Sequence, residues 1–493
     1  MIPTTDQEDT SVPNVRGSSL KLFSVVAVFA LLISSASAQS ITVLKHQPPD
    51  GAQLTFQLTD GTVLAQGYGD SDWWKLTPDN TGSYVNGTWT QVASLPPAYS
   101  PEAFASAVLA DGRLLITGGE YNFLNFTLTN LGAIYDPAAN TWTNLPPPKS
   151  WKNIGDSPAS VLPNGNFLVG NKLTTKMQVY NPSTGKWAAS SPKGKSDFNA
   201  EEGWTLLADG TILTADVLDA PNSEIYSTAK PKGWKTAGST IVDLHSPSPF
   251  GCLQYPPKNK CYNPPGEIGP AILRPDGTVF VTGSYTSTGS GAGHTAIYDS
   301  LTRAWTVGPD FPSGDNAGDS FAALLPNGDV LVEGDSGKGY LWDGNKLTAT
   351  NNVPGCLMVL PTGQILVGGV EVYNGPGTYQ TSWQPAITSA PTSVTRGSTY
   401  SISGTQFNGL SQANSFGDEY QTATNYPLVR ITNNSTGHVF YAKTHGHSSM
   451  GVATGSAIVS TNFDVSAATE TGPSTLVVVA NGIPSPSVNV TVQ

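Results

Sequence analysis

Charged residues are scarce in this 493-residue chain, and positively charged ones are scarcest. Only 12% of the residues are charged, and 24 Lys and Arg stand against 36 Asp and Glu, for a formal net charge of −12. Such a chain has no basic stripe to meet phosphates, so we expect no nucleic-acid partner. No segment shows sustained helical periodicity with caps, which argues against a helical fold.

Long hydrophobic runs are also missing. The apolar stretch near the N-terminus, Leu22–Ile33, has 12 residues, whereas a membrane-spanning helix needs roughly 20. Lys21 precedes this stretch, and Ala36-Ser37-Ala38 follows it as a small-residue cleavage site. We therefore predict that residues 1–38 are a signal peptide and that the mature protein is secreted, periplasmic or on the cell surface. No membrane segment is expected after cleavage.

Cysteine is too rare to define a disulfide scaffold, since the chain has three. Cys252 and Cys261 lie in one proline-rich insertion and are predicted to pair. Cys356 lies inside a strand-like run and is predicted to be a buried thiol.

Glycine, by contrast, is abundant, and it recurs in a repeated pattern. Ser106–Gly119 reads SAVLADGRLLITGG, a strand-like run, an Asp-Gly turn, a second run and a diglycine. Such a turn between two strands is a strong hairpin signal, because glycine accepts the positive φ that the turn requires. Seven turn glycines, 35 to 67 residues apart, mark the repeats: Gly61, Gly112, Gly165, Gly210, Gly277, Gly328 and Gly363. Spacing of this size indicates a propeller.

The second half of each repeat supports the same prediction. Most repeats carry a tyrosine and then a tryptophan, as in Tyr135 and Trp142, which we expect to pack between neighbouring units. Four strands, a diglycine and this aromatic pair resemble the kelch repeat. The sequence thus predicts an all-β protein, with a seven-bladed kelch-type β-propeller over residues 41–385. It leaves open whether a strand near Ile41–Leu44 closes the ring. Short alternating runs over residues 386–493 predict one immunoglobulin-like β-sandwich.

Three C-terminal segments add a more specific resemblance. YPLVR (residues 426–430), KTH (443–445) and GIPS (482–485) resemble, in order and spacing, the last domain of the galactose oxidase and glyoxal oxidase family. This resemblance implies a secreted propeller whose axis could carry a mononuclear copper held by two tyrosines and two histidines, one tyrosine being cross-linked to a cysteine. The positions that match the family's Tyr-His pair are Gly318 and Asp319, and Ala103 matches the radical tyrosine. A shared fold does not establish a shared activity, so the site residues themselves have to be compared.

Most of the residues that would hold this copper are absent from the sequence. No cysteine lies in the first two repeats. Of the histidines only His445, with His447 nearby, matches the family, on a loop that in the family reaches down the axis. One histidine cannot hold copper in that geometry, so we expect no copper-radical oxidase activity.

A ring of carboxylates is predicted in place of that site. Counting back nine or ten residues from the turn glycine reaches a carboxylate in five of the seven repeats: Glu102, Asp156, Glu201 (followed by Glu202), Glu267 and Asp319. The other two repeats have Ala52 and Pro354 there. Carboxylates around one axis repel one another, so they must bind a cation, share protons or accept hydrogen bonds from the backbone.

Two interpretations of this ring stay open. The carboxylates could bind a divalent cation, Ca²⁺ or Mg²⁺ with oxygen ligands alone, or a transition metal if His445 and His447 join Asp319 and Glu267. Alternatively, each carboxylate could accept hydrogen bonds from a neighbouring repeat and act structurally.

Three functions follow as hypotheses. The first, which we favour, is a monomeric extracellular protein that binds a carbohydrate or another polar ligand at the acidic site, with Trp151 and Trp204 nearby. The second is a divergent metal-dependent enzyme, an oxidoreductase or hydrolase, that uses the same site. The third is a structural or adhesive surface module. The sequence does not decide whether the protein is an enzyme.

Overall fold

The computed structural model describes residues 39–68, 71–246, 253–255, 260–262, 266–285 and 292–493. These residues form β-strands and loops, with no α-helix and only two short 3-10 turns, η1 (Pro312–Gly314) and η2 (Thr381–Trp383). Nothing in this part of the chain is a helix with the length and apolarity to cross a membrane. The predicted signal peptide and Cys252 of the predicted disulfide lie outside the described residues. Cys356 is a buried free cysteine, as predicted.

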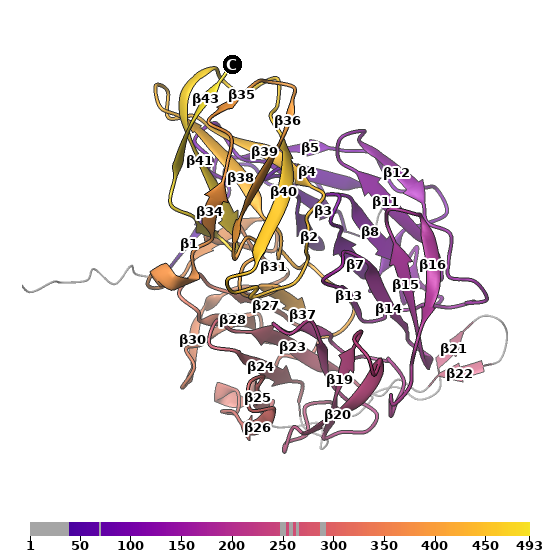
Figure 1. Cartoon of the computed structure of the whole chain (residues 1–493). Coiled ribbons are helices and arrows are strands. Elements are labelled where there is room, and N and C mark those ends of the chain that lie inside the picture. The colour runs from indigo at the N-terminus through magenta and orange to yellow at the C-terminus, as the bar shows by residue number, and fades with distance from the viewer. Residues whose placement is uncertain (1–38, 69–70, 247–252, 256–259, 263–265, 286–291) are drawn as a thin grey trace, which may run out of the picture. The chain divides into compact units, whose positions relative to one another are not determined.

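Four antiparallel meanders follow one another along the chain between residues 54 and 239 (Figure 1). Each has four strands in sequence order: β2 (Leu54–Gln57), β3 (Val63–Gln66), β4 (Trp73–Thr77) and β5 (Thr88–Gln91); β7 (Ala105–Val108), β8 (Leu114–Thr117), β11 (Gly132–Asp136) and β12 (Thr141–Asn144); β13 (Ala159–Val161), β14 (Phe167–Asn171), β15 (Thr174–Asn181) and β16 (Lys186–Ser190); β17 (Thr205–Leu206), β18 (Ile212–Ala215), β19 (Asn222–Ser227) and β20 (Gly233–Ser239).

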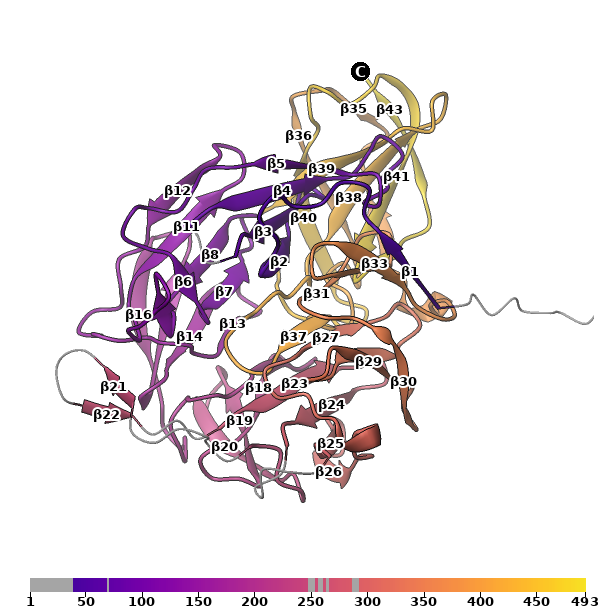
Figure 2. The ribbon, with the colours of Figure 1, turned by 180° about the vertical axis from the view of Figure 1, so that it is seen from behind.

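Three further meanders complete a ring of sheets. They contain β23 (Ile268–Leu273), β24 (Thr278–Gly283), β25 (Thr295–Asp299) and β26 (Ala304–Val307); β27 (Phe321–Leu324), β28 (Val330–Glu333), β29 (Lys338–Trp342) and β30 (Leu347–Asn352); and β31 (Leu357–Val359), β32 (Ile365–Val367) and β33 (Glu371–Asn374). The N-terminal strand β1 (Ser40–Val43) pairs antiparallel with β33 and supplies the fourth strand of that last sheet (Figure 2). The first and last segments of the ring thus close it by hydrogen bonds, which the sequence left open. A small hairpin, β21 (Leu253–Tyr255) and β22 (Lys260–Tyr262), lies between the fourth and fifth sheets in sequence.

The repeated turn joins the first two strands of each sheet in one particular way. In the first repeat the Gly61 N–H donates to the Leu58 carbonyl, and the Leu58 N–H donates to the Thr62 carbonyl. The positive φ falls on Gly61 alone, at 78°, which is a type I turn followed by a left-handed glycine. Asp60 accepts the Thr62 N–H at 3.0 Å, and this is why an acidic or amide residue precedes the glycine.

The tyrosine–tryptophan pairs pack between neighbouring sheets, as predicted. Tyr135 and Trp142 have ring centroids 5.1 Å apart, and the Trp142 indole N–H donates at 3.0 Å to the carbonyl of Ala93, which follows the last strand of the preceding sheet. Trp187 donates in the same way to the Pro146 carbonyl at 2.7 Å. The repeated aromatic pair therefore combines apolar burial with a hydrogen bond between sheets.

The strands after residue 385 form a separate antiparallel sheet with one parallel pair and its own apolar cluster, which includes Ile402, Phe463 and Leu476. Its strands are β34 (Ala386–Ser389), β35 (Ser393–Val394), β36 (Thr399–Thr405), β38 (Leu428–Asn433), β39 (Val439–His445), β40 (Ile458–Asp464), β41 (Gly472–Ala480), β42 (Ile483–Pro484) and β43 (Val488–Val492). The immunoglobulin-like assignment and the predicted domain boundaries stay predictions.

One segment of this C-terminal part leaves its sheet and enters the ring. Between β36 and β38 the chain runs through residues 406–427, and β37 (Asn414–Phe416) within it pairs antiparallel with β27 of the sixth meander. Residues 411–422 are all buried. Side-chain contacts to other sheets anchor the same segment, since Gln412 accepts the Leu206 N–H at 2.7 Å and Asn414 accepts the Val359 N–H at 3.0 Å.

Candidate functional site

A cavity of about 660 Å³ lies where the inner strands of several sheets begin. Its wall contains all five carboxylates that the count from the turn glycines singled out: Glu102, Asp156, Glu201, Glu267 and Asp319. The structure therefore brings together side chains that are more than 200 residues apart in the chain, and it leaves Ala52 and Pro354 out of the lining.

A left-handed backbone residue at the entrance of each inner strand turns the chain toward this cavity. Four sheets use glycine and three use a residue with a Cβ: Gly51, Gly155, Gly266 and Gly355, and Ala103, Glu201 and Asp319, the last three with φ of 50°, 53° and 49°. A left-handed conformation at a non-glycine residue costs of the order of 1 kcal/mol. Two of the three strained residues are cavity carboxylates, so the strain lies at the candidate site.

The C-terminal segment supplies a second group of lining residues that the sequence analysis missed. Phe416, Asp418, Glu419 and Tyr420 all line the cavity. The Tyr420 hydroxyl accepts the Ala103 N–H at 2.7 Å, which fixes this segment beside Glu102. The length of this segment could have indicated its role, because more than 20 residues separate β36 from β38. A loop of that length inside a compact domain is usually functional.

A hairpin over the second sheet contributes a third group. β6 (Pro101–Glu102), β9 (Tyr121–Asn122) and β10 (Asn125–Phe126) form a small sheet of their own, in which Glu102 is opposite Tyr121. Glu120, Tyr121 and Phe126 line the cavity from this hairpin. Because these residues follow the diglycine of the repeat, a search confined to the inner-strand entrance could not find them.

Lys172 is the positive charge of this site, and the sequence analysis did not single it out. Its side chain is fully buried, and its ammonium group hydrogen-bonds to Asp156 and, at 2.6 Å, to Glu201. Glu120 is 3.9 Å from the same nitrogen. Lys172 thus stabilises one side of the cavity wall, while the Glu267 and Asp319 side faces Asp418: one oxygen from each of these three lies within 4.8 Å of the others.

Burial makes several of these carboxyl groups weak acids. It raises the pKa of Glu267 to about 7, with the Glu201 charge adding to the effect. The Asp319 side chain borders the open space of the cavity, but protein atoms surround it on the other sides. This surrounding protein raises the pKa of Asp319 well above the usual value. Burial also raises the pKa of Asp156 and Glu419 strongly, although Lys172 opposes the shift at both. A hydrogen bond joins the Glu267 and Asp319 carboxyl groups, and the Glu267 charge adds to the rise in the pKa of Asp319.

These raised pKa values predict that the protein is more stable at pH 5 than at pH 8. Between the ordinary pKa values near 4 and the raised ones, about 7 for Glu267 and Glu333 and about 8 for Asp216, the folded state binds more protons than the unfolded state. The free energy of unfolding therefore falls as the pH rises through this window. Thermal melts at pH 5, 6, 7 and 8 measure it, and we expect Glu267→Gln to flatten the dependence. A melting temperature that rises from pH 5 to pH 8 contradicts the prediction.

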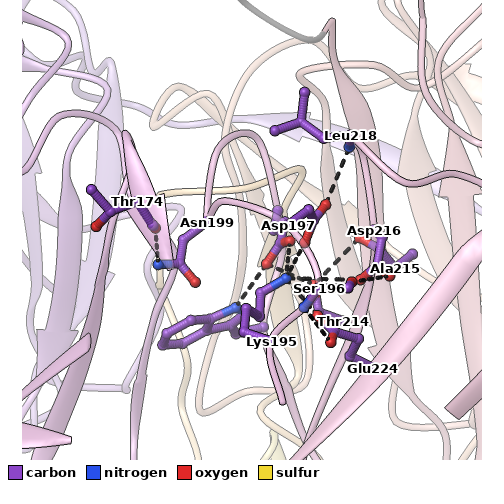
Figure 3. A network of polar contacts seen from close by, with 12 residues as sticks. Thr174, Lys195, Ser196, Asp197, Asn199, Thr214, Ala215, Asp216, Leu218 and Glu224 are labelled. Carbon is purple, nitrogen blue, oxygen red and sulfur yellow. Dashed lines mark hydrogen bonds and ion pairs between the residues drawn. The ribbon is translucent and has the colours of Figure 1, made fainter. Parts of the chain in front are cut away.

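Glu202, which was predicted to bind ligand with Glu201, lies in a different cluster. Its carboxylate is 2.6 Å from the buried ammonium group of Lys195, which also contacts Asp197 and, at 2.6 Å, Glu224, with Asp216 at 3.9 Å. Figure 3 shows Asp197, Asp216 and Glu224 converging on the end of Lys195. None of these residues lines the cavity. Burial raises the pKa of Asp216 to about 8, and it also holds the pKa of Glu202 well above its usual value.

The structure does not bring the other predicted side chains to the cavity. His445 is 3.1 Å from Asp464, and buried His447 hydrogen-bonds to Thr461 at 2.8 Å and stacks on Tyr426. The residue 406–427 segment, rather than the loop with these histidines, enters the ring. Therefore His445 and His447 do not join Glu267 and Asp319 as metal ligands.

Both predicted tryptophans belong to the apolar core. Trp204 is 1% exposed and packs on Trp234 with centroids 5.7 Å apart, and Trp151 is buried in the main hydrophobic cluster. Their large apolar area favours packing over ligand contact.

Comparisons with known proteins agree with the repeat pattern. No protein-family model matches this sequence. It is similar to the kelch-like protein terF of Aspergillus terreus (24% identity over 267 residues, 51% of this chain and 52% of that protein). It is also similar to N-acetylneuraminate epimerase of Haemophilus influenzae (23% over 392 residues, 65% of this chain and 97% of that protein). The match thus spans about half the length of the first relative.

Among solved structures, the chain is similar to a fungal alcohol oxidase of the AA5 family in complex with copper (13% identity, 93% of this chain and 99% of that chain, TM-score 0.46). It is also similar to virginiamycin B lyase from Staphylococcus aureus (11% identity, 68% and 98%, TM-score 0.45). With the kelch-like relative, the successive meander sheets and their tyrosine–tryptophan pairs, the architecture is clear. The chain contains a kelch-type β-propeller. At these identities the comparisons say nothing about what this propeller binds.

The residues of the propeller cavity do not fit a copper-radical cofactor. Among the described residues that line it there is no histidine and no cysteine, and its donors are carboxylate, amide and phenol oxygens. Copper(II) in such sites prefers nitrogen ligands, whereas oxygen donors suit Ca²⁺ and Mg²⁺.

Proposed function

We propose that this kelch-type propeller binds a small polar ligand, a carbohydrate or a cation, in the acidic cavity. The observation that carries the proposal is one cavity of about 660 Å³ that carboxyl groups and aromatic rings from the propeller and the C-terminal segment line together. Its volume is within the range of small-molecule sites, about 300–1,000 Å³. Secretion and an extracellular ligand belong to the same proposal.

The chemistry of the wall suits such a ligand. Carboxylate oxygens accept hydrogen bonds from hydroxyl and ammonium groups. Tyr121 and Phe126 are half-buried and line the wall. Aromatic rings pack against the apolar side of a sugar ring or against a cation. The oxygens of Glu267, Asp319 and Asp418 are close enough to bind one Ca²⁺ or Mg²⁺ together.

A second candidate function is acid–base catalysis in the same cavity. The hydrogen-bonded pair Glu267 and Asp319 favours it, because burial raises the pKa of Glu267 to about 7, where a carboxyl group can both donate and accept a proton. This candidate keeps the hypothesis of a divergent enzyme open, with a bound metal as an option. A third, structural role would leave the cavity without a ligand.

Binding is tested by replacing a cavity carboxylate and measuring affinity. We expect Asp319→Ala to weaken the best ligand from a glycan array and a Ca²⁺/Mg²⁺ panel by about 10- to 100-fold, the loss of one hydrogen bond to a charged group. The backbone tolerates this change, because Ala103 has the same left-handed conformation at the equivalent position. Exposed Asp219 does not line the cavity, so Asp219→Ala is the matched control. Equal affinity of both variants would exclude this cavity as the binding site.

A further inference from the structure

The cavity wall is strongly unbalanced in charge. Of the described residues that line it, eight carry a carboxyl group and none is a lysine or an arginine. The buried Lys172 behind the wall hydrogen-bonds to Asp156 and Glu201. Glu120 is 3.9 Å from the same ammonium group, whereas Glu267, Asp319 and Asp418 have no basic partner among the described hydrogen bonds and ion pairs. A neutral ligand would leave this imbalance as it is, whereas a positively charged ligand would reduce it.

One carboxylate oxygen at the wall lacks a donor altogether. Asp156 is 3% exposed, and its Oδ1 is buried and has no hydrogen-bond partner in the described structure, while its Oδ2 contacts Lys172. Protein atoms cover this oxygen, so it adds to the excess of acceptors at the wall without itself being open to a ligand.

Two pairs of aromatic rings line the same cavity, each pair at a steep angle, and are called the aromatic corners below. The Tyr121 and Phe126 centroids are 6.0 Å apart with an interplanar angle of 70°. Those of Phe416 and Tyr420 are 5.0 Å apart at 64°. Phe416 and Tyr420 are buried and also pack on Phe321, so the half-buried Tyr121 and Phe126 are more open to a ligand. A cation within about 6 Å of a ring centroid is attracted by the electron-rich face. Metal ions gain little from these rings, whereas an organic ammonium group combines them with the carboxylates.

We propose that the ligand of this cavity carries a protonated amine, as in an amino sugar or a polyamine, and that its ammonium group binds between the carboxyl groups and the aromatic corners. This inference rests on the proposed binding function and specifies the ligand class. The hydroxyl groups of an amino sugar would occupy the remaining acceptors.

The test compares probes that carry a protonated amine with probes that do not. Isothermal titration calorimetry of the mature protein with glucosamine and with N-acetylglucosamine, together with putrescine, Ca²⁺ and Mg²⁺, separates an amine from a neutral sugar and from a metal. We expect at least one amine to bind, and glucosamine to exceed N-acetylglucosamine at least tenfold. If putrescine does not bind and glucosamine binds no more tightly than N-acetylglucosamine, or if the metals alone bind, the amine is overturned and the polar-ligand function stands. Binding of no probe overturns both.

An aromatic variant supplies the second arm. Phe126→Ala is expected to weaken the amine roughly tenfold, the range of one cation–π contact. Phe123 is at the exposed tip of the same hairpin and does not line the cavity. Phe123→Ala is therefore the control, with thermal melts of both variants to verify folding. An unchanged amine affinity in Phe126→Ala overturns the aromatic part of the site.

Discussion

Replacing Lys195 by methionine is expected to lower the free energy of unfolding by about 3–5 kcal/mol, the typical cost of removing one partner from a buried ion network. The ammonium group is fully buried among Asp197, Glu202 and Glu224, whose side chains are at most 5% exposed. It also lies 5.3 Å from the centre of the Trp234 ring. Without it, buried carboxylates keep their charge with no counter-ion or must take up protons. Urea denaturation at constant pH measures the loss.

The control is the neighbouring Lys193, which is exposed in the same loop. Lys193→Met is expected to change stability by less than about 0.5 kcal/mol, as surface substitutions usually do. The deficit of Lys195→Met should be larger at pH 8 than at pH 5, because protonation at low pH neutralises the orphaned carboxyl groups. A loss below about 1 kcal/mol, or one that is larger at pH 5, would show that the cluster does not depend on Lys195.

Replacing Lys172 by methionine is expected to lower the free energy of unfolding by about 3 kcal/mol, the lower end of the range given for Lys195. Its partners Asp156 and Glu201 line a cavity into which water can enter, so part of their charge is stabilised by solvent after the substitution. The variant should also make the cavity more negative, and a protonated amine should then raise its melting temperature more than that of the unchanged protein.

Exposed Lys176, on β15 of the same sheet, provides the matched substitution. Lys176→Met should leave both the stability and the ligand-induced shift unchanged. If Lys172→Met proved more costly than Lys195→Met, the two clusters would not differ in solvent access as the structure indicates.

The repeats and the ring of carboxylates were within reach of local reasoning. Hairpin turns depend on residues that are adjacent in sequence, so Asp60 and Gly61 already encode the backbone of their turn. Because every repeat uses the same turn, one offset from its glycine finds the entrance of each inner strand. That offset also found Glu201, but it could not separate Glu201 from Glu202, since a left-handed residue there sends one side chain to the cavity and the next to Lys195.

The histidines show where local reasoning failed. His445 and His447 matched a family pattern in order and spacing, yet His445 pairs with Asp464 within the C-terminal sheet. The segment that reaches the cavity is the preceding one, with Asp418, Glu419 and Tyr420. A loop's destination depends on contacts with partners hundreds of residues away, such as the Tyr420 contact with Ala103, and these leave no periodic trace in the sequence.

The sequence by itself determined the all-β class, the kelch-type repeat and the positions at which carboxylates enter the ring, because turns and strand alternation are properties of neighbouring residues. Only the tertiary structure decided which carboxylates face one another, which of them Lys172 and Lys195 neutralise, and that aromatic rings from a hairpin and from the C-terminal segment complete the wall. Charge pairing inside a protein depends on distance and burial, and the chain acquires both only when its distant segments pack together.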